Sequence, residues 1–436
     1  MQIIENLKVK EKLYVEKLEN GLKIMIMPKP DMQKKYIIWG TNFGSIDNTF
    51  ILPGEKEPTK VPDGIAHFLE HKMFEQKEGT NSLDTLSNIG VEANAYTTND
   101  HTAYLYEATD NFYEALDEFM DYVQNPYYTD ENVEKEKGII AQEIKMYDDN
   151  AEWEAYSNAL KNMYGSHPIA IKISGSVESI SKIDKETLYK CYNNFYNPAN
   201  MTMVVCGDFE PEKLLEEIKK RLIEKENIGE TQRIYPKIEK GVNKKETQVE
   251  MEVSQPVFDI AFKDPVYSEE SSLADLEQNR VKRHIAIEII LYLLLGRSSN
   301  LYKQLYEKGI LLNQPDLSYE FSKHYGYVMI TGQSKEPKKI AEGLEKEIKR
   351  LKENGISQDD FFRVRKKTYG DFVTEYNNLE SIATMFLGDD FKGINCFDYI
   401  EECNLLTKEY TEQVLEEVFE EENMTISIVN PKKTRN

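Results

Sequence analysis

The chain has 436 residues, which is long for one hydrophobic core and predicts two large domains. Its hydrophobic content of 40% and charged content of 30% are those of an ordinary globular protein. The formal net charge of −23 argues against nucleic-acid binding, because phosphate contacts require a basic surface. This charge either serves solubility alone or also attracts cationic partners such as basic peptides.

The sequence predicts neither secretion nor a membrane anchor. Its N-terminus lacks an apolar segment followed by a small-residue cleavage site, so we expect no signal peptide. The longest apolar run, 285–296, is interrupted by Glu288 and is too short to span a bilayer, which predicts a buried helix. The cysteines form no C-x-x-C pair and predict buried thiols in a reducing cytoplasm; they are Cys191, Cys206, Cys396 and Cys403.

Strands and helices alternate along the first half in a pattern typical of an α+β domain. Asn20-Gly21 separates two β-rich runs and predicts a hairpin, which a third strand follows at 36–45. Residues 94–108 alternate and are rich in Thr and Tyr, which predicts one strand or a strand pair. Helices are predicted near 111–124, 130–149, 151–163 and 184–195, and a short buried strand at 201–207.

A polar stretch with Gly and Pro at 226–245 predicts a linker or hinge between domains at 1–225 and 246–436. The tripeptide Asn-Met-Thr occurs at 200–202 and again at 423–425, each time directly before a β-branched strand. The two copies lie 423 − 200 = 223 residues apart, about half the chain. We therefore expect two α+β domains of the same design.

The segment "HFLEH" at 67–71 is the strongest chemical signal in the chain. Residues four apart lie on one helix face, so His67 and His71 can present their imidazoles to one ion, with Glu70 close by. A catalytic zinc site adds a third ligand and keeps one position open. The alternative is a pair of surface histidines beside a solvated glutamate.

The context of this motif is similar to the pitrilysin, insulin-degrading enzyme and mitochondrial processing peptidase family of inverted zinc proteases. "DGIAHFLEHKMFE", "LENGLKIMIMP", "ANAYTTNDHTAYLYE", "VEKEKGIIAQEIKMYDDN" and "YNPANMTMVVCGD" all occur in the order of that family. The similarity is close over 14–225 and looser beyond, and it is greatest to the small bacterial processing peptidases. It implies two homologous domains, each a mainly antiparallel sheet covered by helices, joined into a clamshell.

The resemblance also implies roles for individual residues. Zinc would be held by His67, His71 and Glu143, with Glu136 as a companion that orients a ligand and Glu70 as the general base. Seven residues separate the two helix glutamates, which keeps them on one face. By spacing alone, nearby glutamates such as Glu131 and Glu134 qualify equally well.

The resemblance assigns the strand in "VEANAYTTND", at 91–100, to substrate binding. In this family a peptide adds to the strand as an extra β-strand, which implies contacts from Asn94, Ala95 and Tyr96. An ordinary internal strand is the alternative. The expected activity is zinc-dependent cleavage of short or unfolded peptides, and the competing expectation is a non-catalytic peptide-binding or structural subunit.

The second half lacks one feature of active relatives, an arginine and a tyrosine seven residues apart that hold substrate. Tyr306 and Asn313 stand at those positions, and Arg297 or Tyr319 are the open substitutes. This absence favours a heterodimer whose paralogous subunit supplies the pair, with a homodimer as the alternative. The other histidines receive no catalytic role: His167 is expected to cap a turn, and structural roles are expected for His101, His284 and His324.

Overall fold

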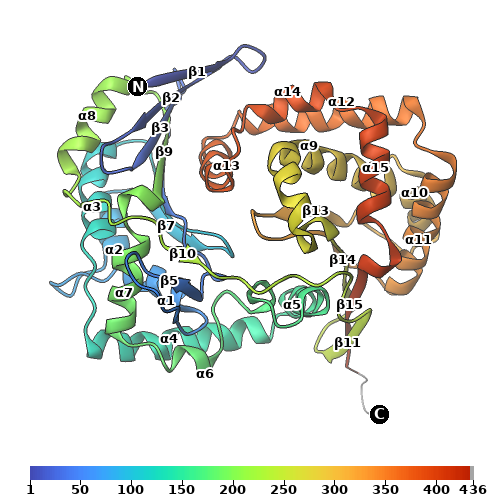
Figure 1. Cartoon of the computed structure of the whole chain (residues 1–436), viewed down its shortest axis with the longest axis horizontal. Coiled ribbons are helices and arrows are strands. Elements are labelled where there is room, and N and C mark those ends of the chain that lie inside the picture. The colour runs from blue at the N-terminus through green and yellow to red at the C-terminus, as the bar shows by residue number, and fades with distance from the viewer. Residues whose placement is uncertain (433–436) are drawn as a thin grey trace. The chain divides into compact units, whose positions relative to one another are not determined.

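A computed structural model describes residues 1–432, and the chain forms two compact units (Figure 1). The first unit contains Met1–Ile144, Lys172–Tyr235 and Thr374–Cys396. The second contains Lys145–Ile171, Pro236–Val373 and the chain from Phe397. These units differ from the expected domains at 1–225 and 246–436, because each half of the chain contributes one segment to the other unit.

The first unit is built on a seven-stranded sheet with the order β1-β2-β3-β9-β4-β8-β7. The hairpin predicted at Asn20-Gly21 is present between β2 and β3, and Gly21 adopts a φ of 95° in its turn. The strands are β1 (Gln2–Asn6), β2 (Glu11–Lys17), β3 (Lys23–Pro28), β4 (Lys35–Thr41), β7 (Glu92–Thr97), β8 (Thr102–Ala108) and β9 (Met201–Gly207). A small second sheet contains β5 (Thr49–Ile51), β6 (Thr59–Lys60) and β10 (Gln232–Arg233).

The helices of the first unit bury apolar faces in one continuous core with the large sheet. They are α1 (Ile65–Lys72), α2 (Ser82–Asn88), α3 (Phe112–Gln124), α4 (Asp130–Asp148), α6 (Val177–Ile180), α7 (Lys185–Phe195) and α8 (Pro211–Arg221). The unit also contains the short helix η2 (Pro198–Asn200) and α13 (Leu379–Lys392), which packs on β4 and β9 outside this core. The helices predicted near 111–124 and 130–149 are thereby confirmed as α3 and α4.

Helix α1 carries "HFLEH" and begins at a backbone position that only glycine fills easily. Gly64 has a φ of 90°, and a Cβ added there would lie 2.5 Å from the carbonyl oxygen of Ser174. The helix then buries the apolar side chains of Ile65, Phe68 and Leu69. This packing fixes the rotation of α1, so that His67 and His71 lie on its partly exposed side.

The second unit repeats the central strand arrangement of the first, which confirms the expected duplication. Its five-stranded sheet has the order β11-β15-β12-β14-β13. β15 is parallel to β11 and antiparallel to β12, as β9 is parallel to β3 and antiparallel to β4. The strands are β11 (Glu246–Met251), β12 (Val257–Lys263), β13 (Asp316–Phe321), β14 (Gly326–Gln333) and β15 (Met424–Pro431). The fold class is α+β with two domains, as expected.

The helices of the second unit include α9, which is longer than the apolar run that predicted it. They are α5 (Ala151–Tyr164), α9 (Glu270–Leu295), α10 (Asn300–Glu307), α11 (Pro337–Asn354), α12 (Gln358–Glu375), α14 (Asp398–Leu405) and α15 (Lys408–Val418), with short helices η1 (Pro168–Ala170), η3 (Pro265–Ser268) and η4 (Glu421–Asn423). The stretch Leu276–Glu307 has the length and apolar composition of a membrane span, but 67% of its apolar window is buried inside the protein. Such burial is expected of a core helix.

The repeated Asn-Met-Thr tripeptide has the same structural role in both units. The side-chain amide of Asn200 donates to the carbonyl of Phe195, the last residue of α7, at 2.9 Å. The amide of Asn423 donates to the carbonyl of Val418, the last residue of α15, at 3.2 Å. In each copy the asparagine donates to a carbonyl at a helix end and leads the chain into a buried strand.

Two helices pack in the unit built mainly by the other half of the sequence. Helix α5 follows α4 in the chain but packs on β12 and β15 of the second unit. Helix α13, from the second half, packs on β4 and β9 of the first. A Cβ on Gly40 of β4 would lie 2.8 Å from Leu387 Cδ2, so the glycine permits the close approach of α13.

The segment expected to be a linker or hinge at 226–245 is partly attached to the first unit. β10 pairs with β5, and the Arg233 guanidinium forms an ion pair with buried Asp47 at 3.1 Å. The Tyr235 hydroxyl donates to the same carboxylate at 2.5 Å. In this segment the chain therefore passes from the first unit to the second directly after Tyr235.

Leu387→Ala tests the assignment of α13 to the first unit. Leu387 is fully buried, so its truncation should destabilise that unit by about 2–5 kcal/mol. The chain has two tryptophans, Trp39 in β4 and Trp153 in α5, and each reports on one unit. Denaturant unfolding followed by Trp39 fluorescence in a Trp153→Phe background measures the effect.

The control is Leu405→Ala, because Leu405 is 66% exposed and its truncation should change stability by less than about 0.5 kcal/mol. A Leu387→Ala effect seen only through Trp153, in a Trp39→Phe background, would contradict the assignment.

Candidate metal centre

Helices α1 and α4 bring two imidazoles and a carboxylate together. The His67 and His71 rings project from one face of α1 with centroids 4.6 Å apart, as the spacing predicted. Glu143 on α4 faces both: its Oε1 lies 3.5 Å from His67 Nε2, and its Oε2 lies 3.4 Å from His71 Nε2. All three side chains are partly exposed, so an ion and a water molecule can reach them.

These three groups fit a divalent metal of the zinc type. One ligand atom from each lies within 4.8 Å of the others. Ligands on a tetrahedral zinc at bonds of about 2.1 Å are separated by roughly 3.4 Å, close to the distances from Glu143 to both histidines. Two histidines and one glutamate are also a donor set of catalytic zinc sites, which leave the fourth position open.

Glu136 lies two helical turns before Glu143 on α4. It contacts Nδ1 of His71, whereas Glu143 faces Nε2 of the same ring. Its Oε1 is 3.1 Å from His71 Nδ1, so an Nδ1–H donates there and leaves Nε2 for a ligand. Burial lowers the pKa of His71, but the hydrogen bond to Glu136 and the nearby carboxylates outweigh it, so the net shift is upward. The hydrogen bond to His67 holds the pKa of Glu143 below its usual value.

The carboxylate of Glu70 is buried and has a hydrogen-bond donor that the sequence did not indicate. The Thr97 hydroxyl, at the end of β7, donates to Glu70 Oε2 at 2.6 Å. The neighbouring Thr102 hydroxyl donates to the Phe43 carbonyl at 2.9 Å, so its proton is already used. The Thr97 proton is therefore available to Glu70, and one oxygen of this carboxylate is held in a fixed position.

Strand β7 lies at the edge of the seven-stranded sheet, as expected for a strand that binds a peptide. The Thr98 amide donates to the His101 carbonyl, so these two residues form a hydrogen-bonded pair at the end of the β7–β8 ladder. Hydrogen-bonded pairs alternate in an antiparallel ladder, so Asn94 and Tyr96 pair with β8. The main-chain groups of Ala95 consequently point to the open edge.

The three expected substrate-binding residues therefore occupy different environments. The exposed Asn94 side chain accepts a hydrogen bond from the outward Ala95 amide at 2.9 Å. The Tyr96 ring instead packs edge-on against His101, with its hydroxyl 3.3 Å from His101 Nε2. Of the three, Ala95 offers main-chain groups and Asn94 a carboxamide at the free edge.

Two residues near the site had no distinguishing signal in the sequence. Thr97 is the last residue of β7, and nothing in the sequence pairs its hydroxyl with Glu70. Lys72 follows His71 directly and is fully buried, although a lysine at a helix end ordinarily indicates a solvated position. Among the other histidines, His167 is confirmed as a cap, because its Nδ1 accepts from the Ile169 amide.

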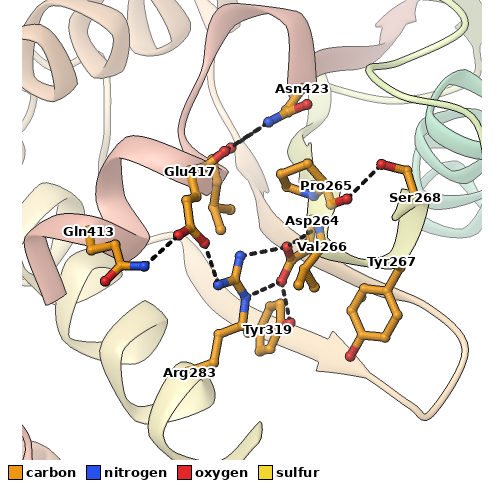
Figure 2. Close-up of polar contacts among 12 residues, drawn as sticks. Asp264, Pro265, Val266, Tyr267, Ser268, Arg283, Tyr319, Gln413, Glu417 and Asn423 are labelled. Carbon is orange, nitrogen blue, oxygen red and sulfur yellow. Dashed lines mark hydrogen bonds and ion pairs between the residues drawn. The ribbon is translucent and has the colours of Figure 1, made fainter. Parts of the chain in front are cut away.

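Tyr319 of the second unit does not act as a substitute for the missing tyrosine, because its hydroxyl is already bound within the unit. Figure 2 shows its hydroxyl directed at Asp264, to which it donates at 2.7 Å. Asp264 is fully buried and also accepts two hydrogen bonds from Arg283, each 2.8 Å long. Arg283 in turn contacts Glu417 at 2.7 Å. Tyr319 thus belongs to a closed structural network.

The two positions at which the resemblance implies an arginine and a tyrosine are solvent-accessible but uncharged. Tyr306 is 56% exposed, and Asn313 is also exposed. Arg297 is exposed as well and lines a cavity of about 340 Å³ with Arg363 and Lys367.

Comparisons with known proteins identify the family of this chain. The sequence model "Insulinase (Peptidase family M16)" matches residues 53–176, which include both histidines and Glu143. The model "Peptidase M16 inactive domain" matches residues 182–368. The uncharacterized zinc protease YmfH of Bacillus subtilis is 37% identical over 433 residues, covering 98% of this chain and 99% of the relative. The chain belongs to the insulinase family, peptidase family M16.

Solved structures agree with this assignment. A putative M16-like peptidase from Alicyclobacillus acidocaldarius superposes with a TM-score of 0.90 at 31% identity, covering 98% of this chain and 100% of that one. A protease from Helicobacter pylori has a TM-score of 0.80 at 19% identity, covering 97% and 100%, and shows the shared fold. The resemblance inferred from the motifs is therefore confirmed, and other curated relatives are also named zinc proteases.

Glu143→Ala tests whether the three side chains form one metal site. Removal of one of three ligands should abolish stoichiometric metal binding, whereas Glu134→Ala on the same helix should leave it intact, because Glu134 is exposed and pairs with Lys137. Metal content after dialysis, measured by elemental analysis, checks both variants. Equal metal content in wild type and Glu143→Ala would contradict this assignment.

Proposed function

We propose that this M16 family member is a zinc-dependent endopeptidase that cleaves short or unfolded peptides bound along β7. The observation that carries the proposal is the Glu143 carboxylate facing both imidazoles at 3.4–3.5 Å, with Glu70 adjacent on α1. The names of the zinc-protease relatives support the choice of metal. His67, His71 and Glu143 are the proposed ligands.

The chemistry follows from the side chains around the proposed metal. When bound, zinc supplies a Lewis acid that polarises a carbonyl and lowers the pKa of water. Glu70 accepts a proton from the attacking water as its oxygen bonds to the peptide carbon, and it donates that proton to the amine nitrogen as the C–N bond breaks. The Thr97 hydroxyl holds one oxygen of Glu70, which leaves the other directed to this proton transfer.

The open edge of β7 supplies peptide binding that depends little on side chains. A substrate strand would exchange main-chain hydrogen bonds with Ala95 and its neighbours. The carbonyl of that strand would replace the Asn94 side chain at the Ala95 amide and release the Asn94 carboxamide to contact the peptide. Because the chain carries a net charge of −23, cationic peptides are the favoured substrates.

The absent arginine–tyrosine pair supports a second proposal about assembly. We propose that a paralogous subunit supplies the pair in a heterodimer, because neither Tyr306 nor Asn313 offers a cationic bidentate group. The homodimer is the alternative outcome. Peptide cleavage by this chain alone, compared with cleavage in the presence of the paralogue, separates the two.

Glu70→Gln separates a peptidase from a non-catalytic peptide-binding subunit. The amide cannot accept the proton, so turnover of an unstructured peptide should fall by at least about 100-fold while zinc content stays equal to wild type. Cleavage assays with mass spectrometry, run with and without the paralogue, measure this change. Stoichiometric zinc without cleavage in either wild-type sample would favour the binding subunit.

Thr97→Val tests the proposed orientation of Glu70. Valine keeps the shape of threonine and its preference for strands but removes the donor to Glu70 Oε2. The value of kcat should fall by about 10-fold or more, since a hydrogen bond to a charged group contributes about 1.5–3 kcal/mol. KM should change little. Thr97→Ser retains the hydroxyl and should restore most of kcat; an equal loss in both variants would contradict the role.

A further inference from the structure

Lys72 is a buried cation beside the candidate metal centre and belongs to none of the roles described above. Its side chain is 0% exposed, and its ammonium contacts the Glu75 carboxylate in the loop after α1. A second carboxylate oxygen, Oε2 of Glu136, lies 3.9 Å from the same ammonium. Burying an ammonium is costly unless opposite charges compensate it, so these two glutamates explain how Lys72 is tolerated.

The two oxygens of Glu136 have different partners. Oε1 accepts from His71 Nδ1 at 3.1 Å, whereas Oε2 faces Lys72. Glu136 is itself buried, so the attraction between its carboxylate and the ammonium is weakly screened by solvent. The carboxylate therefore lies between a fixed cation and the imidazole that it orients.

We propose that Lys72 is a positioning residue that acts on the metal centre through Glu136. Its ammonium holds the Glu136 carboxylate in the orientation that accepts the Nδ1–H of His71. That hydrogen bond directs Nε2 of His71 toward Glu143 and the open metal position. Glu75 also contacts the ammonium and ties the loop after α1 to the same arrangement. This inference rests on the proposed zinc site.

The test is a double-mutant cycle on zinc affinity, measured by competition with a chromogenic chelator. Lys72→Met keeps the approximate length of the side chain and removes its charge. It should weaken zinc binding by about 10–100-fold, as the loss of a group that supports a metal ligand does. Glu136→Gln should have a similar effect. In the Glu136→Gln background, Lys72→Met should add less than about 3-fold, because the two residues act as one unit.

Two further variants separate charge from packing. Lys72→Arg retains the positive charge and should bind zinc more tightly than Lys72→Met, whereas a purely steric role predicts no such rescue. Lys263→Met is the matched control, because Lys263 is 1% exposed and donates to the carbonyls of Met163 and Gly241 in the second unit. Lys263→Met should lower the melting temperature of the zinc-free protein, measured with a chelator present, without changing zinc affinity. If Lys72→Met does not fold, Lys72→Gln replaces it in the cycle.

The possible results are distinct. Unchanged zinc affinity in Lys72→Met, or an equal loss in the wild-type and Glu136→Gln backgrounds, overturns the positioning role while the zinc site stands. A wild-type chain that binds no zinc overturns both the inference and the proposed function.

Discussion

The site depends on the core that α1 and α4 share, which places two imidazoles opposite two carboxylates. Both helices contribute apolar side chains to one core, including Phe68 and Leu69 from α1 and Ile140 and Ile144 from α4. The polar positions of each helix are thereby held at the rim of that core. Glu143 reaches both histidines only because neither helix can rotate without exposing apolar surface.

Each surrounding element adds a constraint to this pair of helices. β7 presents the Thr97 hydroxyl to Glu70 on one face and leaves the main chain of Ala95 open on its edge. A base and a binding surface for extended peptide are therefore fixed by the same strand. The motif residues thus depend on the rigidity of a seven-stranded sheet whose opposite side is covered by α13.

The spacing of the motif predicted much of the site, and the resemblance to a family predicted most of the remainder. His67 and His71 share a helix face for reasons of helical geometry alone. Glu143 could not be selected in this way, because Glu131 and Glu134 lie on the same predicted helix, and only three-dimensional packing or a known pattern distinguishes them. Thr97 and Lys72 were not predicted, since a side chain's partner across the fold leaves no local signal.

The fold was predictable to a similar degree. The Asn20-Gly21 turn and the repeated Asn-Met-Thr tripeptide have local physical causes, namely a positive φ and the capping of a helix end, and both are present. The exchange of α5 and α13 between the two units has no such signature. An amphipathic helix shows which of its faces is buried but not which sheet covers that face.

The central claim is that α1 and α4 together form a single zinc site. Crystals of the zinc-loaded protein, measured on both sides of the zinc absorption edge, would locate the ion directly by its anomalous signal. The account predicts one peak in the first unit, about 2.0–2.2 Å from His67 Nε2, His71 Nε2 and a Glu143 carboxylate oxygen. A peak ligated by other residues, or no peak near these three side chains, would contradict it.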